Sequence, residues 1–339
     1  MKSVIAPKYN RQAGETQIAL KDMPDVVTLW ATGRCNFKCR YCIQSADEKV
    51  KRLESFPIDQ MMSWDTFLKC VGQIQEFGKK LTAIVFCGVG EPLLNPRLEE
   101  MISYIKQNHV AGYAEVVTNA ALLTEERSLA LIDAGLDFLS VSIQGVSTKS
   151  YFETCGVSLN IDTLVKRLTF FANHKTNCHL HVKTVDIALK NRQEYQQFAD
   201  LFGDIADSIF VDHAIPLFKN IDYTKILVQE RDQYTGELLK RQEKHPCALL
   251  FNAVYVQPDG RVVPCCTTPN PVIYGSIYED SIKSIWEGNL RKRFMIQHLK
   301  GNRKTYSACR DCVQPEILSS PEGVANLCIE NMIHELSKK

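Results

Sequence analysis

Residues 34–42 read Arg-Cys-Asn-Phe-Lys-Cys-Arg-Tyr-Cys, so that Cys35, Cys39 and Cys42 follow a C-x3-C-x2-C spacing. Three thiolates in one loop can hold three irons of a [4Fe-4S] cluster and leave the fourth iron open, whereas a closed electron-transfer cluster takes four cysteines. A zinc site is the alternative, but structural zinc takes four ligands from paired Cys or His arms. Because no fourth Cys or His lies near this loop, the spacing predicts an iron–sulfur cluster with one open iron.

With Tyr41 as the aromatic residue before the last cysteine, this loop resembles the signature of the radical S-adenosylmethionine (SAM) superfamily. The resemblance implies that the open iron chelates the amino and carboxylate groups of SAM's methionine part. It also implies that the reduced cluster splits SAM into methionine and a 5'-deoxyadenosyl radical, which removes a hydrogen atom from a substrate C–H bond. We therefore expect an enzyme, and an iron–sulfur electron carrier or scaffold is the alternative.

Composition restricts the partners and the compartment. Forty Lys and Arg face 39 Asp and Glu, for a formal charge of +1, so no basic field for nucleic acid is indicated. No apolar run approaches the roughly 18 residues of a membrane span, and residues 1–25 lack an apolar signal region. Thirteen cysteines without a secretory signal favour metal binding over disulfides. We expect a cytoplasmic protein that binds neither nucleic acid nor membranes.

Short runs rich in β-branched residues alternate with helical patterns, which is typical of repeated βα units on a parallel sheet. Strands are expected at residues 26–32, 81–86, 114–117, 138–142, 179–187 and 209–211. Helices are expected at residues 64–79 after the N-cap Ser63, 97–108, from Thr124 to Gly135, 161–174 and 193–202. The fold class is therefore α/β, a partial (β/α)6 TIM-like barrel.

Candidate motifs follow the strands, where βα barrels build their sites. Taken singly, each of these motifs more often forms a turn than a ligand-binding site. The resemblance assigns cofactor binding to Tyr41, Gly88, Gly90, Glu91, Pro92, Asn119 and Ser142. It implies that Glu91 binds the methionine ammonium of SAM, that Thr118-Asn119 matches the family's Thr-Asn-Gly turn with Ala120 in the glycine place, and that Ser142 contacts SAM's carboxylate or ribose.

Cysteines resume in the last third of the chain. Cys247 precedes a β-hairpin expected at residues 253–263, whose turn is Pro258-Asp259-Gly260. Then come Cys265-Cys266, a helix containing Ile285-Trp286-Glu287-Gly288, and Cys309-x2-Cys312. This order resembles a SPASM domain in its truncated, single-cluster twitch form, since only Cys328 follows. The resemblance implies an auxiliary [4Fe-4S] cluster on four thiolates: Cys247, Cys265, Cys309 and Cys312. A tetrahedral zinc on the same thiolates is the rival.

These features predict five parts: an N-terminal extension (1–25), the radical SAM core (26–217), a charged linker or helix (218–246), the auxiliary β-hairpin and helix domain (247–320) and a C-terminal helix (321–339). Four further cysteines are expected to behave as small buried hydrophobic residues: Cys70, Cys155, Cys178 and Cys328.

The pair Cys265-Cys266 bears on the reaction. Adjacent side chains on an extended strand point in opposite directions, so Cys266 is expected to face away from the cluster that Cys265 ligates. A thiol there can return a hydrogen atom to the opposite face of a carbon radical and invert the centre, which resembles radical SAM epimerases of aminoglycoside sugars and ribosomal peptides. We therefore expect epimerisation of a sugar-like or aminocyclitol substrate, with Cys266 as the hydrogen donor. Alternatively, the side chain of Cys266 only packs against its neighbours and has no role in the reaction.

Dehydrogenation is the competing reaction, and it resembles that of the single-cluster aminocyclitol dehydrogenase. A base takes the proton of a carbinol radical and the auxiliary cluster takes its electron, giving a ketone. The candidate bases, by position at strand ends, are Asp212, His213 and Lys183. The expected substrate is small and sugar-like, or a short peptide, and the expected electron donor is a flavodoxin or ferredoxin.

Overall fold

The computed structural model describes residues 3–7, 18–53, 56–241, 245–265, 272–318 and 327–338. Within this part of the chain, no helix has both the length and the apolar composition that crossing a membrane requires.

One sheet of ten described strands organises the molecule, in the order β1-β7-β6-β5-β4-β3-β2-β8-β9-β10. From β1 to β8 all neighbours run parallel, and β9 and β10 continue antiparallel. The strands are β1 (Val4–Ile5), β2 (Val26–Leu29), β3 (Leu81–Phe86), β4 (Ala111–Thr118), β5 (Phe138–Ile143), β6 (His179–Val185), β7 (Ser208–Asp212), β8 (Ala253–Val256), β9 (Arg261–Val263) and β10 (Gly275–Ser276). The six strands β2 to β7 confirm the predicted partial barrel.

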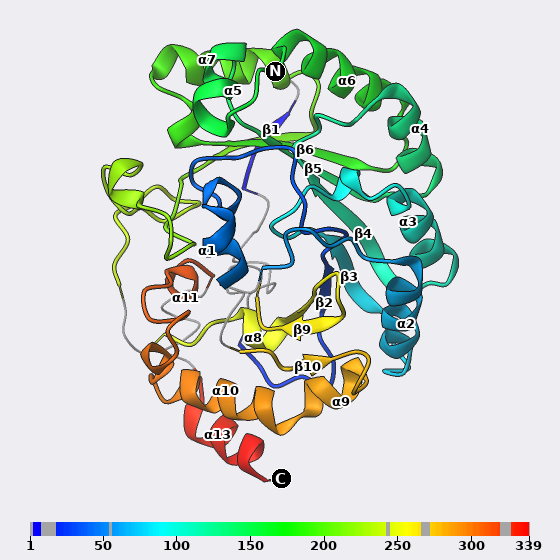
Figure 1. Cartoon of the computed structure of the whole chain (residues 1–339), viewed down its shortest axis with the longest axis vertical. Helices are drawn as coiled ribbons and strands as arrows, with labels where there is room; N and C mark the ends of the chain where they lie inside the picture. The colour runs from blue at the N-terminus through cyan, green and yellow to red at the C-terminus, as the bar shows by residue number, and fades with distance from the viewer. Residues whose placement is uncertain are drawn as a thin grey trace.

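Helices cover the outside of this sheet, where α2, α3, α4 and α6 form an arc around the strands (Figure 1). The described α-helices are α1 (Glu48–Leu53), α2 (Trp64–Gln75), α3 (Leu98–Gln107), α4 (Glu125–Asp133), α5 (Thr148–Cys155), α6 (Ile161–His174), α7 (Arg192–Phe202), α8 (Leu249–Asn252), α9 (Ile282–Glu287), α10 (Asn289–Leu299), α11 (Gln314–Leu318) and α13 (Ile329–Ser337). The predicted cap Ser63 is confirmed, since it accepts from Thr66 N at 3.0 Å. The helix expected from Thr124 is capped by this residue, whose hydroxyl accepts from Arg127 N at 3.2 Å.

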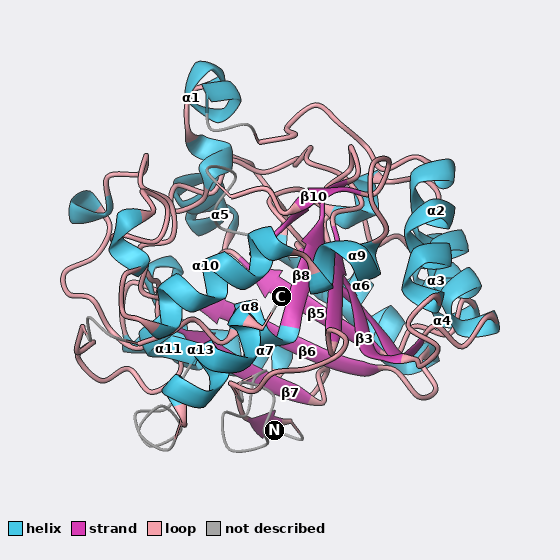
Figure 2. Ribbon diagram, turned by 90° about the horizontal axis from the view of Figure 1, so that it is seen from below, coloured by secondary structure: helices cyan, strands magenta, loops and turns pink. Residues whose placement is uncertain are grey.

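The C-terminal region is joined to the barrel rather than merely following it. Its strand β8 pairs in parallel with β2, with Val26 opposite Ala253, and α9 and α10 lie in front of the strands in the view of Figure 2. The side chains of Leu29, Phe251 and Trp286 belong to one buried hydrophobic cluster. The hairpin predicted at 253–263 is confirmed as β8 and β9, while the predicted domain boundaries stay predictions.

The structure differs from several of the predicted secondary-structure elements. Strand β6 ends at Val185 because residues 186–188 form a 3-10 turn. The charged segment after β7 contains no described α-helix, and holds a 3-10 turn at Tyr223–Lys225 and an antiparallel bridge between Arg231 and Leu238. The C-terminal helix is described from Ile329, and residues 319–326 lie outside the described residues.

The spare cysteines divide into two kinds. Three of them, Cys70, Cys155 and Cys178, are buried, as predicted. The prediction for Cys328 is wrong, because it precedes the surface helix α13 and is exposed.

Candidate active site

The cysteine loop follows β2 and is held by the end of α5. Lys38 N donates to the Cys155 carbonyl and Arg40 N to the Thr154 carbonyl, both at 2.9 Å. Sequence reasoning missed α5, although its signals were present: Ser147 and Ser150 form a reciprocal capping box, and Gly156 ends the helix with φ +72°. The helix therefore fixes the middle of the loop that carries the three thiols.

These thiols lie close to one another and favour the protonated form while no metal is bound. Burial raises the pKa of Cys35 to about 12, and the charges of Glu91 and Cys42 act in the same direction. A hydrogen bond with Cys155, then burial and Cys42, raise the pKa of Cys39. In the described part of the chain, no three His, Cys, Asp or Glu side chains are arranged to hold a single metal ion.

The donor set fits an iron–sulfur cluster. Thiolates are the soft ligands that such clusters use, and a coordinated thiol loses its proton outright. The three thiols come from one fixed loop at the carboxyl end of β2, beside the glycine loop after β3. Cys35, Cys39 and Cys42 are each part-exposed, so a ligand from solution can reach them.

The glycine loop after β3 packs tightly against the end of β2. Gly88 has φ +151°, and a Cβ there would lie 2.7 Å from the indole carbons of Trp30. A Cβ on Gly90 would overlap the carbonyl of Thr32. Both positions therefore require glycine, and Pro92 then begins a 3-10 turn that leaves the loop.

Glu91 is buried in this loop and joins the ends of β3 and β4. Its Oε1 accepts from Leu93 N at 3.0 Å and from the Thr118 hydroxyl at 2.6 Å, and its Oε2 accepts from Asn119 N at 2.7 Å. Burial raises the pKa of this carboxyl, and the hydrogen bonds from Asn119, Thr118 and Leu93 oppose the rise. Since a carboxylate has about four acceptor positions, one remains for a ligand.

Asn119 connects the β4 end to the cysteine loop. Its Nδ2 donates to Asn36 Oδ1 at 2.8 Å, and its Oδ1 accepts from Ala121 N at 2.9 Å. The following Ala120 has φ +58°, the left-handed conformation that glycine adopts more easily. Asn119 therefore both shapes its own turn and links two loops of the site.

A cavity of about 190 Å³ opens at the carboxyl ends of β5, β6 and β7. It is lined by Tyr41, Ser142, Ile143, Gln144, Lys183, Thr184, Val185, Asp212, His213, Ala214, Ile215, Leu217 and Gln233. The Tyr41 hydroxyl donates to Gln144 Oε1 at 2.6 Å, which ties the cysteine loop to this cavity. The predicted cofactor residues Tyr41 and Ser142 and all three candidate bases thus share one site.

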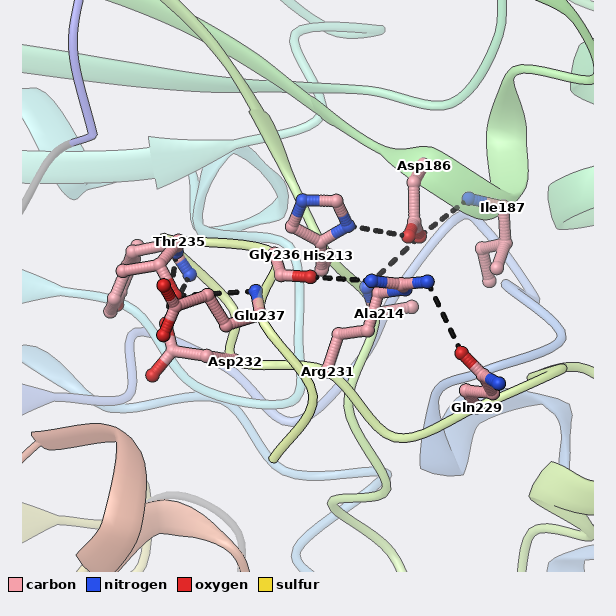
Figure 3. A network of polar contacts seen from close by, with 11 residues as sticks. Asp186, Ile187, His213, Ala214, Gln229, Arg231, Asp232, Thr235, Gly236 and Glu237 are labelled. Atoms are coloured by element: carbon pink, nitrogen blue, oxygen red, sulfur yellow. Dashed lines mark hydrogen bonds and ion pairs between the residues drawn. The ribbon is translucent and has the colours of Figure 1, made fainter. Parts of the chain in front are cut away.

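One ion pair and one histidine–carboxylate contact position polar side chains of the cavity. Lys183 Nζ donates to Asp212 Oδ2 at 2.7 Å, and the Asp212 side chain is 4% exposed. His213 Nδ1 lies 2.9 Å from Asp186 Oδ2, and the other oxygen of Asp186 accepts from the backbone N–H groups of Ile187 and Ala214 (Figure 3). The backbone bonds fix Asp186, which in turn fixes the imidazole of His213.

The segment 229–239 forms a further wall of this cavity. His213 N donates to the Gln233 carbonyl at 2.9 Å, and Arg231 Nη1 donates to the Gly236 carbonyl at 2.7 Å (Figure 3). Gly236 has φ +72° and packs so closely on His213 that a Cβ would overlap the imidazole. Sequence reasoning took this segment for a linker or helix, although the turn residues Asp232 and Gly236 signal a compact loop.

The four predicted auxiliary ligands come from separate segments of the C-terminal region: just before α8, after β9, and the loop between η6 and α11. Burial raises the pKa of Cys247 well above its usual range, and the charges of Cys312, Cys265 and Cys309 add to the rise. Four thiolates are the donor set of a closed [4Fe-4S] cluster. The predicted hydrogen donor Cys266 lies outside the described residues.

Known protein families match both halves of the chain. Residues 31–189 match the radical SAM superfamily, and residues 247–313 match SPASM, an iron–sulfur cluster-binding domain. The tungsten-containing aldehyde ferredoxin oxidoreductase cofactor-modifying protein of Pyrococcus furiosus is 25% identical over 319 residues, which cover 83% of this chain and 85% of that protein.

Solved structures share the fold. BtrN in complex with AdoMet and 2-DOIA has a TM-score of 0.55 and 17% identity, covering 88% of this chain and 97% of BtrN. SuiB of Streptococcus suis bound to S-adenosylmethionine has a TM-score of 0.62 and 14% identity, covering 88% of this chain and 72% of SuiB. SuiB has also been solved with its precursor peptide SuiA.

Proposed function

Because this chain is a radical SAM enzyme with a C-terminal SPASM iron–sulfur domain, we propose that it oxidises a hydroxyl-bearing carbon of a small, sugar-like substrate to a ketone. The observation that carries the proposal is the Lys183–Asp212 pair in the cavity next to Tyr41. When bound, SAM and the two clusters supply a 5'-deoxyadenosyl radical and a one-electron acceptor.

The residues that hold these groups follow from the site. We assign the SAM-binding cluster to Cys35, Cys39 and Cys42. The auxiliary cluster is assigned to Cys247, Cys265, Cys309 and Cys312. The glycine loop and the Glu91 carboxylate would hold SAM, with Glu91 binding its ammonium, and an electron carrier such as flavodoxin or ferredoxin would act as the reductant.

Lys183 and Asp212 act on the substrate hydroxyl. Loss of the hydrogen atom from carbon leaves a carbinol radical, whose O–H is a far stronger acid than that of the parent alcohol. Asp212 accepts this proton, and the hydrogen bond from Lys183 holds the carboxyl group of Asp212 in place. The substrate thus loses one hydrogen atom, one proton and one electron, and a C=O bond forms.

The size of the cavity favours a small substrate. At about 190 Å³ it is smaller than the roughly 300–1,000 Å³ of pockets for drug-sized ligands. The cavity also offers the amide of Gln144 and the imidazole of His213, which suit hydroxyl groups. BtrN was solved with the small molecule 2-DOIA and SuiB with a peptide, so a short peptide is the second substrate class.

Epimerisation is the second candidate reaction, favoured by the Cys265-Cys266 pair. Cys265 is assigned to the auxiliary cluster, and Cys266 is the next residue in the chain. In this case Cys266 donates a hydrogen atom to the carbon radical from the opposite face. Its hydrogen exchanges with solvent, so product made in D2O carries one deuterium at the inverted carbon.

Product mass separates the two reactions. Reconstituted enzyme, dithionite and SAM are incubated with a panel of sugars, aminocyclitols including 2-DOIA, and nucleotide sugars, and 5'-deoxyadenosine identifies the substrate. Dehydrogenation gives a product lighter by two hydrogen atoms, whose formation Cys266→Ala leaves intact. A product of unchanged connectivity that gains one deuterium, and that Cys266→Ala abolishes, would establish epimerisation instead.

Asp212 is tested against a matched residue at the opposite end of the same strand. Asp212→Asn is expected to lower ketone formation about 10²- to 10⁴-fold while SAM cleavage persists. Asp207, just before β7, bonds Leu180 N and Lys175 outside the cavity, so Asp207→Asn should leave turnover intact. Equal losses in both variants would show that the effect is one of folding and would remove the role given to Asp212.

A further inference from the structure

Arg303 is a buried arginine beside the auxiliary ligand loop. It opens the 3-10 turn η6 (Arg303–Thr305), and its side chain is 2% exposed. Its Nη1 donates to the carbonyl of Cys309 at 2.8 Å and to the carbonyl of Cys312 at 2.9 Å. One guanidinium group therefore holds the peptide groups of two of the four ligand residues.

A buried carboxylate accompanies this arginine. Arg303 Nη2 donates to Glu316 Oε1 at 2.7 Å, and the Glu316 side chain, from α11, is 3% exposed. Burying two charges costs several kcal/mol of desolvation for each, so such a pair is weak evidence for a purely stabilising role. Because the Arg303–Glu316 pair lies beside the predicted auxiliary cluster, an effect of its charges on that cluster explains it better than stabilisation of the fold does.

Both charges lie beside the ligand loop, with opposite signs. The Arg303 guanidinium contacts the backbone of Cys309 and of Cys312, and the Glu316 carboxylate contacts the same guanidinium. Both side chains are almost fully buried, so water screens neither charge from the ligand loop.

We propose that Arg303 and Glu316 are positioning residues that fix the Cys309–Cys312 loop and set the reduction potential of the auxiliary cluster. The proposal rests on the auxiliary cluster and not on ketone formation, so it stands whichever reaction the enzyme performs.

The physical reason is the charge balance around a buried cluster. Iron–sulfur potentials depend on net charge, on hydrogen bonds around the ligands and on solvent exposure, and charges interact strongly where water is excluded. Reduction adds a negative charge, which Arg303 stabilises and Glu316 opposes. Removing the arginine charge should lower the potential, and removing the glutamate charge should raise it.

The same loop offers a matched control. Arg241 Nη1 donates to the carbonyl of Asp311 at 2.8 Å, so it also binds the Cys309–Cys312 loop, but its side chain is 40% exposed and pairs with Glu230 at the surface. Water and salt screen a charge in this position. Arg241→Gln should therefore leave the potential of the auxiliary cluster unchanged.

The experiment is a redox titration of full-length protein reconstituted with both clusters, followed by electron paramagnetic resonance. Added SAM changes the signal of the SAM-binding cluster and so identifies the auxiliary signal. Glu316→Gln is expected to shift the auxiliary potential upward and Arg303→Gln downward, each beyond the scatter of wild type and Arg241→Gln. Arg303→Lys keeps the charge and should retain a near wild-type potential with weaker iron retention.

Shifts of opposite sign in the reduction potentials of Glu316→Gln and Arg303→Gln distinguish an electrostatic role from a merely structural one. Shifts of the same sign, or no shift in a Glu316→Gln protein that keeps its iron, would overturn the proposal. If Arg303→Gln loses auxiliary iron, the test rests on Glu316→Gln and Arg303→Lys. Loss of auxiliary iron from both of these variants would reduce the pair to scaffolding and would also overturn it.

Discussion

Replacing Glu91 by glutamine tests the SAM site at its most connected residue. The amide keeps the shape of the side chain and one carbonyl oxygen for Thr118 and Leu93, but its NH2 group faces the N–H of Asn119, a donor that Glu91 Oε2 now satisfies. One buried donor is left without an acceptor, at a cost of about 1–3 kcal/mol in folding stability. The variant should still fold.

Glu91→Gln should reduce the free energy of SAM binding by a larger fraction than it reduces the free energy of unfolding. A charge-assisted hydrogen bond to the methionine ammonium contributes about 1.5–3 kcal/mol, so Glu91→Gln should raise the Kd for SAM roughly 10- to 150-fold. Equilibrium dialysis of anaerobically reconstituted protein measures the Kd, and iron analysis confirms that the cluster is intact. Urea unfolding measures the cost in stability.

Thr118→Val is the matched control for Glu91→Gln. It removes a hydroxyl that donates to Glu91 and accepts from Ala120 N but keeps the carboxylate, so SAM affinity should change only a few-fold for a loss of about 1–3 kcal/mol of stability. If Glu91→Gln kept its iron and bound SAM as wild type does, Glu91 would only join the ends of β3 and β4, and the ammonium would have to bind elsewhere.

Two further predictions concern metal content and pH. Anaerobically reconstituted protein should hold about eight irons per chain, and replacing Cys35, Cys39 and Cys42 together by Ala should leave about four; a wild-type value near four with one zinc would remove the auxiliary cluster. Burial lowers the pKa of His298 to about 3, so the unfolded chain binds a proton below about pH 6.5 that the folded chain does not. Stability should fall by about 1.4 kcal/mol per pH unit from this group as pH drops from about 6.5 toward 3. His298→Phe should flatten that slope in urea unfolding, and an unchanged slope would assign it to other groups.

Local patterns predicted the elements of the barrel well. Strand β3 at 81–86 and helix α6 at 161–174 have the predicted ends, because each is a continuous apolar or periodic stretch between clear stop signals. The predicted helix start at Thr124 and the stop at Gly135 are also confirmed, the latter with φ +80°. These features depend on neighbouring residues only, so the sequence carries them directly.

Local sequence patterns could not predict the contacts between segments that are distant in the chain. The Tyr41–Gln144 hydrogen bond joins residues 103 positions apart, and the bond from His213 to Gln233 turns an apparent linker into a cavity wall. The pairing of β8 with β2 likewise depends on how the chain returns. The thiol, glycine and acidic residues of the site could be named in advance, whereas the groups that position them could not.

Transfer of a hydrogen atom from the substrate carbon to the 5'-deoxyadenosyl group can be followed with deuterium. A substrate from the panel, deuterated at the hydroxyl-bearing carbon, is turned over by reconstituted enzyme, and the 5'-deoxyadenosine is analysed by mass spectrometry. Our account predicts that 5'-deoxyadenosine gains the deuterium and that the ketone product has lost it. Product formed alongside 5'-deoxyadenosine that contains no deuterium would contradict abstraction at that carbon, and with it the site built around Lys183 and Asp212.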